Sequence, residues 1–332
     1  MFKQTPRVGF ACKIQQSPGT ADKALNTSST TIAWLSKQTK QKAYERLYAL
    51  AKFNIEALKK QISFLAKQPE HLRMFRMTSD LLTAYTHEDY MWCYQELDMQ
   101  NLLERGFKEC GELARKHDIR LSFHPGQFCV LASESDQIVE NSIYEFEYHT
   151  DIARWMGYGQ EFQDFKINVH IGGKRGPEGI KQVLKKLSRE ARNCLTIENA
   201  EFSWGLQHSL ELAQDCALVL DIHHHWIMTG EYIQVDDWRV QKVIDSWRGV
   251  RPTIHYSISR TEHTGHLDRD QPYNLKQLLA SGLTKAKLRA HSDYYHNTWC
   301  NQWAKEFLPY VDIMCEAKEK NLASFELAQE II

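Results

Sequence analysis

Two patterns of apolar positions alternate along the chain. The first is a short, β-prone apolar run, and it occurs at residues 8–12, 72–77, 119–123, 165–170, 195–198, 217–221, 253–256 and 311–315. The second is a longer stretch with apolar residues at steps of three and four, as in Leu47, Ala51, Ile55, Leu58, Ile62 and Leu65. The short runs predict buried strands, and the longer stretches predict amphipathic helices.

The order of these patterns predicts the fold class. Helical spacing recurs over residues 103–113, 180–187 and 238–247, each time ahead of a further run. Strands that alternate with helices indicate a parallel sheet, because parallel neighbours need a crossover connection. Eight such strands in roughly 300 residues fit a closed (β/α)8 barrel better than an open doubly wound sheet, and no glycine-rich dinucleotide loop follows the first run. We predict a single α/β TIM-barrel domain over residues 1–332, with segment 16–29 as a long loop.

Composition narrows the class of protein. The chain of 332 residues is 42% hydrophobic and 25% charged, which is typical of a soluble globular enzyme. No apolar run reaches the roughly 18 residues of a membrane span, and the first residues lack a signal-peptide core, so we expect a cytoplasmic protein. The eight cysteines include no CxxC pair, which argues against a disulfide framework. A net charge of −1 excludes binding of nucleic acid by overall charge alone.

The 15 histidines give the first indication of chemistry. In a (β/α)8 barrel the active site lies at the C-terminal ends of the strands and in the loops that follow them. Seven of the eight predicted strands end in, or are followed by, His, Asp or Glu: His87, His124, His170, Glu198, Asp221 with the triplet 223–225, His255 and Glu316. The first strand instead carries Phe10 and Cys12.

Each of these residues also has a structural interpretation. Acidic and polar residues at strand ends often cap the next helix or hydrogen-bond a loop. We assign four other histidines to ordinary surface positions on or beside helices: His71, His117, His149 and His208. Such residues at seven of the eight predicted strand ends, all at the rim where barrels perform catalysis, nevertheless indicate a shared site.

The residue types at this rim favour metal ions. Four or more imidazoles and three carboxylates, without thiolate, suit Zn²⁺ or Mn²⁺, and they exceed the needs of one ion. We therefore expect two or three ions with a bridging carboxylate such as Glu198, an arrangement used for phosphoryl transfer. A sugar isomerase on the same fold would also use carboxylates and histidines, but with a lysine and fewer imidazoles.

Two loops have features of a DNA-binding surface. Lys174 and Arg175 follow two glycines after the fourth run and could meet phosphates, although a solvated turn explains them equally well. Gln127 and Phe128 follow the third run and could insert into a base stack, whereas the structural alternative is a buried Phe.

These segments, in this order, resemble the UV damage endonucleases, which are barrel relatives of endonuclease IV. The resemblance runs from residues 7–10 to residues 316–318. Its most specific pieces are SFHPGQF at 122–128, HIGG at 170–173, IEN at 197–199 and DIHHH at 221–225. The family cleaves DNA immediately 5′ to ultraviolet photoproducts with a cluster of divalent ions, commonly manganese.

The resemblance implies a role for individual residues. The metal ligands would be His87, His124, His170, Glu198, Asp221, His224, His255 and Glu316. Gln127 and Phe128 would probe the lesion, while Phe10 would stack where the family often has tyrosine. Asn199, His291 and Tyr294 would line the site. One position departs from the family: Thr253 stands two residues before His255, where a lysine is usual, which bears on metal preference or rate rather than on the ligand set.

The sequence therefore predicts a metal-dependent DNA repair endonuclease. It would use two or three divalent ions, Mn²⁺ foremost and Zn²⁺ or Mg²⁺ as alternatives, to activate water, with no separate side-chain base. Its partner would be damaged double-stranded DNA, and we expect a monomer without membrane contact. The alternatives are an abasic-site endonuclease or a sugar-phosphate isomerase on the same barrel, and a non-catalytic protein that senses damage.

Overall fold

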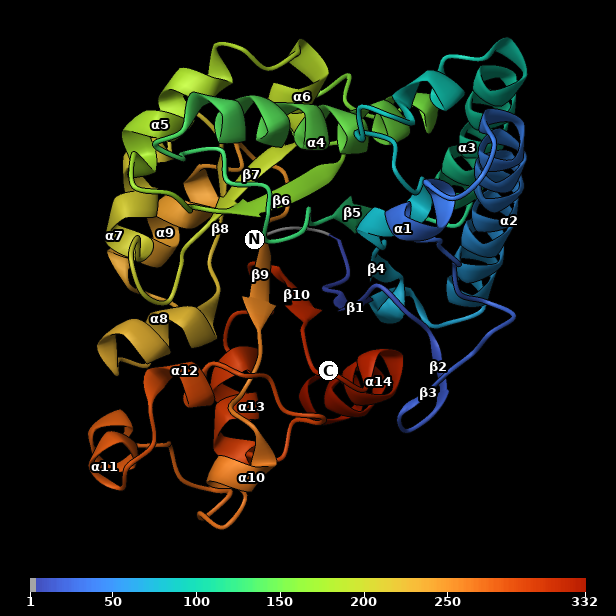
Figure 1. Ribbon diagram of the computed structural model, residues 1–332. Helices are drawn as coiled ribbons and strands as arrows, with labels where there is room; N and C mark the ends of the chain where they lie inside the picture. Colours follow the sequence, from blue (N-terminus) through green and yellow to red (C-terminus); the bar gives the residue numbers. More distant parts are fainter. Residues whose placement is uncertain (1–3) are drawn as a thin grey trace.

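The computed structural model describes residues 4–332, and its main feature is an eight-stranded sheet in the order β8-β7-β6-β5-β4-β1-β10-β9. The first and last strands of that order are β8 (Ala217–Val219) and β9 (Thr253–Tyr256). A parallel bridge between Asp221 and His255 joins their ends, and the His255 N–H donates to the Leu220 carbonyl at 3.0 Å. The sheet thus closes into the predicted TIM barrel (Figure 1).

All eight barrel strands fall within the predicted runs. The other six are β1 (Val8–Ala11), β4 (Met74–Arg76), β5 (Arg120–Phe123), β6 (Lys166–His170), β7 (Leu195–Glu198) and β10 (Asp312–Cys315). Two of the predicted runs exceed their strands by two or more residues. The run at 72–77 begins with a 3-10 turn, η1 (Glu70–Leu72), and the run at 217–221 stops being a strand at Val219.

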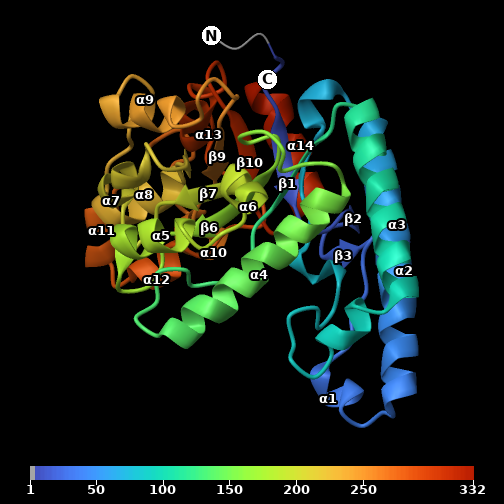
Figure 2. The ribbon, with the colours of Figure 1, turned by 90° about the horizontal axis from the view of Figure 1, so that it is seen from above.

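Helices form the outer layer of the barrel, and the four helical stretches predicted from spacing are confirmed. They correspond to α2 (Lys40–Ala66), α3 (Leu97–Lys116), α5 (Gly176–Leu184) and α9 (Trp238–Asp245). α2 and α3 lie side by side along one edge of the molecule (Figures 1 and 2). The remaining α-helices are α1 (Ile32–Leu35), α4 (Asp136–Trp155), α6 (Arg189–Cys194), α7 (Leu206–Ser209), α8 (Ile222–Thr229), α10 (Thr261–Thr264), α11 (Leu275–Ala280), α12 (Lys285–Leu288), α13 (Thr298–Lys305) and α14 (Lys320–Ile331).

The two faces of the sheet differ in polarity. Successive strand residues point to opposite faces, and the outer set packs with the helices in the large hydrophobic core. Inside the barrel, Ala11, Met74 and Met314 form a small apolar cluster of their own. Other buried strand residues are polar: Ser122, Lys166, Asn168, Thr196 and Thr253. The barrel interior is therefore unusually polar just below the rim where the site was predicted.

Two predictions about local structure are wrong. Segment 16–29 is not simply a loop, because its start belongs to a short antiparallel hairpin of β2 (Gln15–Ser17) and β3 (Thr20–Ala21). His149 is not a surface residue, because its side chain has no exposed area and packs against Phe123 at a ring distance of 5.0 Å. Among the helices of residues 4–332, none combines the length and the apolar character needed to cross a membrane.

Candidate metal centre

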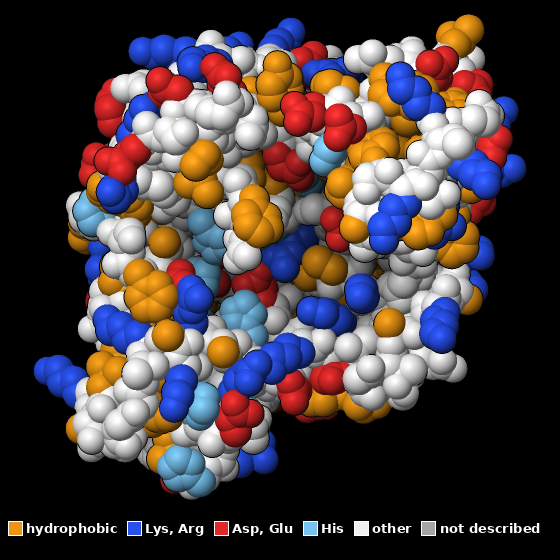
Figure 3. Space-filling view, viewed as in Figure 1, with side chains coloured by type: hydrophobic (Ala, Val, Ile, Leu, Met, Phe, Trp, Pro, Cys, Tyr) orange, Lys and Arg blue, Asp and Glu red, His pale blue; other side chains and the backbone are white. Residues whose placement is uncertain are grey.

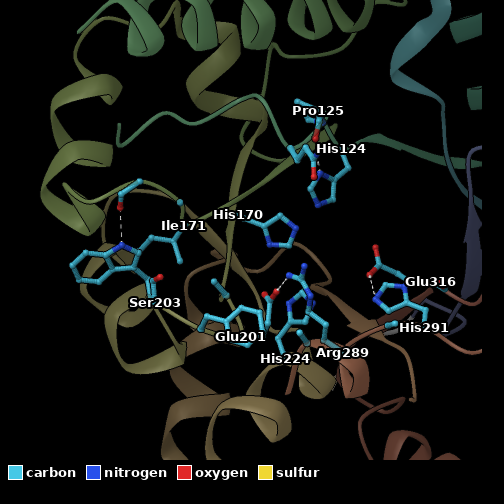
Figure 4. Close-up of a pocket in the computed structure, with 18 of the residues that line it drawn as sticks. His124, Pro125, His170, Ile171, Glu201, Ser203, His224, Arg289, His291 and Glu316 are labelled. Carbon is cyan, nitrogen blue, oxygen red and sulfur yellow. Dashed lines mark hydrogen bonds and ion pairs between the residues drawn. The ribbon is translucent and has the colours of Figure 1, made fainter. Parts of the chain in front are cut away.

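A cavity of about 1250 Å³ opens where the strands end. Its walls come from the loops after β5, β6, β7 and β10 and from the end of α12. In the space-filling view, histidines and basic side chains gather in and around this hollow (Figure 3), and Figure 4 shows the lining side chains. The charged and imidazole residues that line it are Arg76, His124, His170, Lys174, Glu201, His224, Arg289, His291, Glu316, Lys318 and Lys320.

Three carboxylates meet beneath this cavity, and one of them, Glu316, lines it. Glu198 is the last residue of β7, Asp221 stands two residues after the end of β8, and Glu316 directly follows β10. Glu198 and Asp221 have no exposed surface. One ligand atom from each of these carboxylates and one from His255 lie within 4.8 Å of one another. Parallel strands bring these side chains together because their carboxyl ends share one rim of the barrel.

Imidazoles surround Glu198. His124 Nε2 lies 3.4 Å from Glu198 Oε2, His224 Nδ1 lies 3.5 Å from Oε1, and His255 Nδ1 lies 3.1 Å from Oε2. His170 forms a second group with His124 and Glu198, whose ligand atoms also lie within 4.8 Å of one another. The two groups share Glu198, so this carboxylate stands where it could bridge two ions.

Backbone contacts orient two of these rings. The His124 Nδ1–H donates to the Pro125 carbonyl at 3.0 Å, and that of His224 donates to the Asn199 carbonyl at 3.1 Å. A carbonyl oxygen can only accept, so Nδ1 carries a proton in each ring, and Nε2 can ligate a metal ion when the ring is neutral.

Burial and neighbouring charges shift the pKa values of the cluster in different directions. Burial lowers the pKa of His255 to about 4, and burial likewise lowers that of His170. Although burial opposes ionisation, His255 and His170 hold the pKa of Glu198 well below its usual range. Burial raises the pKa of Asp221 well above its usual range. Although burial lowers the pKa of His224, the carboxylates of Asp221 and Glu198 raise it to about 9. The crowded carboxylates thus favour positive charge among them.

The donor set fits divalent cations. Glu198 Oε1, Asp221 Oδ2 and His255 Nδ1 are buried and have no hydrogen-bond partner among residues 4–332. Buried polar atoms without partners are costly, and a cation held between them would satisfy all three. The two groups offer oxygen and imidazole nitrogen without thiolate, which suits Mn²⁺, Zn²⁺ or Mg²⁺.

Sequence reasoning missed the cations and the amide that hold this cluster. Arg76, the last residue of β4, pairs with Glu316. Lys166 Nζ lies 3.1 Å from His255 Nε2, and the Asn168 side-chain amide donates to Glu198. Burial lowers the pKa of Lys166 to about 7. The sequence signal was limited to His, Asp and Glu at strand ends, whereas Asn168 and Lys166 lie in β6 two and four positions before His170, on the same inward face.

Two predicted site residues lie elsewhere. His87 belongs to neither candidate group and does not line the cavity in the described part of the chain; its Nδ1 accepts from the Asp89 N–H at 3.2 Å, and its ring packs on Tyr90. Phe10 is fully buried and packs on Phe75 at a ring distance of 5.1 Å. The prediction that Phe10 stacks on DNA is therefore wrong for this conformation, because β1 turns that side chain outward into the helix layer.

The four residues predicted to meet DNA from the loops have different environments. Gln127 lines the cavity, and Phe128 beside it is 85% exposed, so it is not the buried Phe of the structural alternative. Lys174 also lines the cavity and pairs with Glu134 at 2.8 Å. Arg175 instead donates to the Glu134 carbonyl at 2.7 Å and to Asp136 at 2.9 Å, which fastens the loop before α4.

The three residues predicted to line the site differ in whether they line the cavity. His291 lines the cavity, with Nε2 3.9 Å from Glu316 Oε2. Asn199 is fully buried and does not line the cavity. Its side chain exchanges two hydrogen bonds with the backbone of Asp221. Tyr294 does not line the cavity, whereas the hydroxyl of the neighbouring Tyr295 accepts from the Glu316 N–H at 3.1 Å.

Of the histidine triplet, His224 alone lines the cavity. His223 is directed at the Leu288 carbonyl, 3.2 Å from its Nε2, and His225 Nε2 lies 3.0 Å from Glu231. Asp221 caps α8 by accepting from the His224 N–H at 2.7 Å, and this cap sets which ring of the triplet faces inward.

Comparison with known proteins assigns the chain to a family. The family described as UV-endonuclease UvdE matches residues 6–332. The chain is 25% identical to the UV DNA damage endonuclease of Bacillus velezensis, over 91% of this chain and 87% of that protein. It is 29% identical to the UV-damage endonuclease of Schizosaccharomyces pombe, over 78% of this chain and 40% of that longer protein.

Solved structures agree on the fold. The crystal structure of SacUVDE superposes with a TM-score of 0.72 over 98% of this chain and 97% of that one, at 21% identity. Endonuclease IV from Thermus thermophilus superposes with a TM-score of 0.53 over 84% and 92%, at 14% identity. The protein is therefore an endonuclease on a TIM barrel, which excludes the isomerase and the non-catalytic alternatives. By sequence and by fold, the chain belongs to the UV-endonuclease UvdE family.

Proposed function

We propose that this endonuclease cuts double-stranded DNA immediately 5′ to ultraviolet photoproducts, as a monomer, with two or three divalent cations, Mn²⁺ foremost. The observation that carries the proposal is the pair of candidate metal groups that share the fully buried Glu198. Paired ions a few ångströms apart are an established arrangement for phosphodiester hydrolysis. The family of the chain, whose curated members are named for ultraviolet damage, supports the substrate.

The residues present would divide the work among themselves. His124 and His170 with Glu198 would hold one ion, and Asp221, His255 and Glu316 with Glu198 would hold another. When bound, the ions would supply an activated water and electrostatic stabilisation of the phosphorane-like transition state. Asn168 and Lys166 would keep Glu198 and His255 in place from below. His224, which lines the cavity, is available to a third ion.

The rim of the cavity suits a nucleic-acid partner despite the net charge of −1. Five cations line it, and only two acids do: the cations are Arg76, Lys174, Arg289, Lys318 and Lys320, and the acids are Glu201 and Glu316. Clustered Lys and Arg bind phosphates regardless of the charge elsewhere. Phe128, exposed at the tip of the loop after β5, would insert beside the lesion, with Gln127 facing the cavity.

A nicking assay on three duplexes tests the proposal. End-labelled ultraviolet-irradiated, abasic and intact duplexes are incubated with the protein in Mn²⁺ or in EDTA. We expect incision of irradiated DNA only, in Mn²⁺ only, with the cut mapped to the 5′ side of the photoproduct. Incision confined to abasic DNA would establish the abasic-site alternative instead, and equal incision in EDTA would refute the role of metal ions.

Substitutions connect the activity to the site. We expect His124→Ala to lower nicking by two orders of magnitude or more while the circular dichroism spectrum is unchanged, because His124 belongs to a candidate metal group at the cavity wall. His117→Ala is the matched control, since His117 ends α3 away from the cavity. Near-normal nicking by the His124→Ala protein would contradict the assignment.

A further inference from the structure

The cations that line the cavity differ in whether they have an acidic partner. Lys174 pairs with Glu134, Arg289 with Glu201, and Lys318 with Asp293. Lys320 has no ion pair and no side-chain hydrogen bond among the residues that the structure describes. An unpaired ammonium group in the wall of a deep cavity is costly, because burial removes part of its hydration.

Arg76 lines the same cavity near Lys320, and its positive charge adds to burial in lowering the pKa of Lys320. It closes β4, and its guanidinium pairs with Glu316 while 15% of the side chain stays exposed to the cavity. Its Nε is buried and has no hydrogen-bond partner among residues 4–332. Glu316 therefore accepts from only some of the five N–H donors of this guanidinium.

Local backbone geometry brings Lys320 to this wall. Lys320 has φ +50°, a conformation that non-glycine residues rarely adopt, and it is the first residue of α14. Strained residues of this kind persist where the surrounding structure holds them, and they concentrate at binding sites. The positive end of the 12-residue helix α14 also lies here, which adds to the local potential.

We propose that Arg76 and Lys320 form a phosphate-binding subsite that holds one backbone phosphate of the DNA strand being cut. The proposal rests on the proposed function, because it takes DNA as the substrate. Two cations on one wall repel each other, and a phosphodiester between them would relieve the repulsion and give Lys320 its missing partner. With two divalent cations bound, the three carboxylates would leave a surplus of positive charge that the same phosphate would offset.

Arg76 would then contact the substrate as well as Glu316. Arg76 pairs with Glu316, a member of a candidate metal group, so the phosphate that it holds is expected to be the scissile one or its direct neighbour. Lys320 would contact the same phosphate. Neither residue donates an atom to the candidate metal groups, so loss of Lys320 should leave metal binding intact.

The test combines charge removal in the protein with charge removal in the DNA. A set of lesion-containing duplexes, each with one neutral methylphosphonate at a different position around the cut, is bound to wild type, Arg76→Met and Lys320→Met. Fluorescence anisotropy is measured in Ca²⁺ and in EDTA, after gels show that the DNA stays intact. Lys52→Met, an exposed cation on α2, is the matched control.

We expect each variant to bind roughly ten-fold or more weakly, with the salt dependence of log K reduced by about one unit, while Lys52→Met matches wild type. A methylphosphonate at one position should weaken DNA binding by wild type to a similar extent. At that position it should weaken binding by the variants little further. If a methylphosphonate at every position lowers the affinity of the variants as much as that of wild type, the subsite does not exist. If Arg76→Met fails to fold, Lys320→Met alone decides the result. The number of Mn²⁺ ions bound by Lys320→Met should equal that of wild type.

The outcome is separable from that of the proposed function. If wild type nicks irradiated DNA in Mn²⁺ but no position shows coupling, only the phosphate subsite is refuted. If wild type shows no preference for irradiated DNA, the lesion specificity is refuted, and coupling measured on an intact duplex still tests the subsite.

Discussion

Glu198 has no exposed surface, and it lies within 3.5 Å of nitrogen atoms of three imidazoles, those of His124, His224 and His255. A buried carboxylate of this kind is a poor choice for stability alone, because its desolvation offsets most of the attraction to its partners. It is instead suited to a site where a cation completes the set of ligands. The unpartnered Oε1 of the same carboxylate supports this interpretation.

Buried histidines outside the cluster make the stability depend on pH. Burial lowers the pKa of His149 to about 4, against about 6.5 in an unfolded chain. Between these values the unfolded state binds the extra proton, so the stabilisation is fully present above pH 6.5 and is lost as the pH falls toward 4. The expected contribution is about 3 kcal/mol.

The variant His149→Asn tests this contribution, because Asn can still donate to the Glu145 carbonyl, which lies 2.7 Å from His149 Nδ1, but cannot titrate. Urea unfolding at pH 7 and pH 4.5 should show a smaller loss of stability for the variant than for wild type. His117→Asn, at a partly exposed position, should behave as wild type does. Equal losses in wild type and His149→Asn would contradict the assignment.

Single residues were predictable from the sequence only where one strand end dictates the direction of the side chain. His124, His170, Glu198 and Glu316 were found in this way. Arg76 was missed because a cation at a strand end was not counted as part of a metal site. Phe10 was misplaced because an apolar residue one position from a strand end points to either face, and packing against Phe75 decides which.

At the scale of elements, the loop from β6 to α5 depends on one glycine. Gly173 has φ +88°, and a Cβ built there would lie 2.2 Å from the Ala132 carbonyl oxygen. Its own carbonyl accepts from Trp204 Nε1 at 2.7 Å. The loop is therefore held between two neighbouring segments, and it fixes the wall of the cavity beside His170.

We expect Gly173→Ala to destabilise the protein by about 2 kcal/mol or more, because both the backbone conformation and the close approach exclude a methyl group. Denaturant unfolding measures this. Gly126→Ala is the matched control: no atom lies within 4 Å of the Cβ position there, and its φ is not in the left-handed region. If the two variants prove equally stable, the loop tolerates a side chain at Gly173 and does not depend on this glycine.

The elements that the sequence predicted are those whose apolar pattern reports burial directly. Barrel strands are buried on both faces, so each appears as a short continuous run. The β2–β3 hairpin escaped prediction because its residues are mostly polar and exposed, and tertiary contacts hold it instead: the Gln15 N–H donates to Asn321 at 2.6 Å, and that of Gly19 donates to Glu319 at 2.9 Å. Contacts across about 300 positions leave no local signal.

At the scale of the whole molecule, the arrangement of charge matters more than its sum. The chain carries 41 basic and 42 acidic residues, yet cations predominate around the cavity while carboxylates gather beneath it. The sequence does not predict that these basic residues gather around one cavity, because they come from β4, α14 and the loops that follow β6, α12 and β10. Only the closed barrel brings them to one face (Figure 3).

This arrangement predicts that the stability of the folded protein depends on metal ions. A ligand that binds only the native state stabilises it by about 2.7 kcal/mol at a concentration 100 times its dissociation constant. We therefore expect Mn²⁺ to raise the Tm by roughly 5 °C relative to EDTA, measured by differential scanning calorimetry. The unfolded chain has no preformed cluster of ligands, so the effect should saturate with the stoichiometry found by elemental analysis.

Glu198→Gln separates this linkage from a general salt effect. The variant loses the shared ligand of both candidate groups, so Mn²⁺ should no longer raise its Tm. In EDTA its Tm should fall only modestly below that of wild type, because the amide lacks the charge that His255 and His170 favour but Asn168 can still hydrogen-bond the amide oxygen. A full Mn²⁺ shift in Glu198→Gln would place the ions elsewhere, and a large loss of stability in EDTA would make Glu198 a structural residue rather than a ligand.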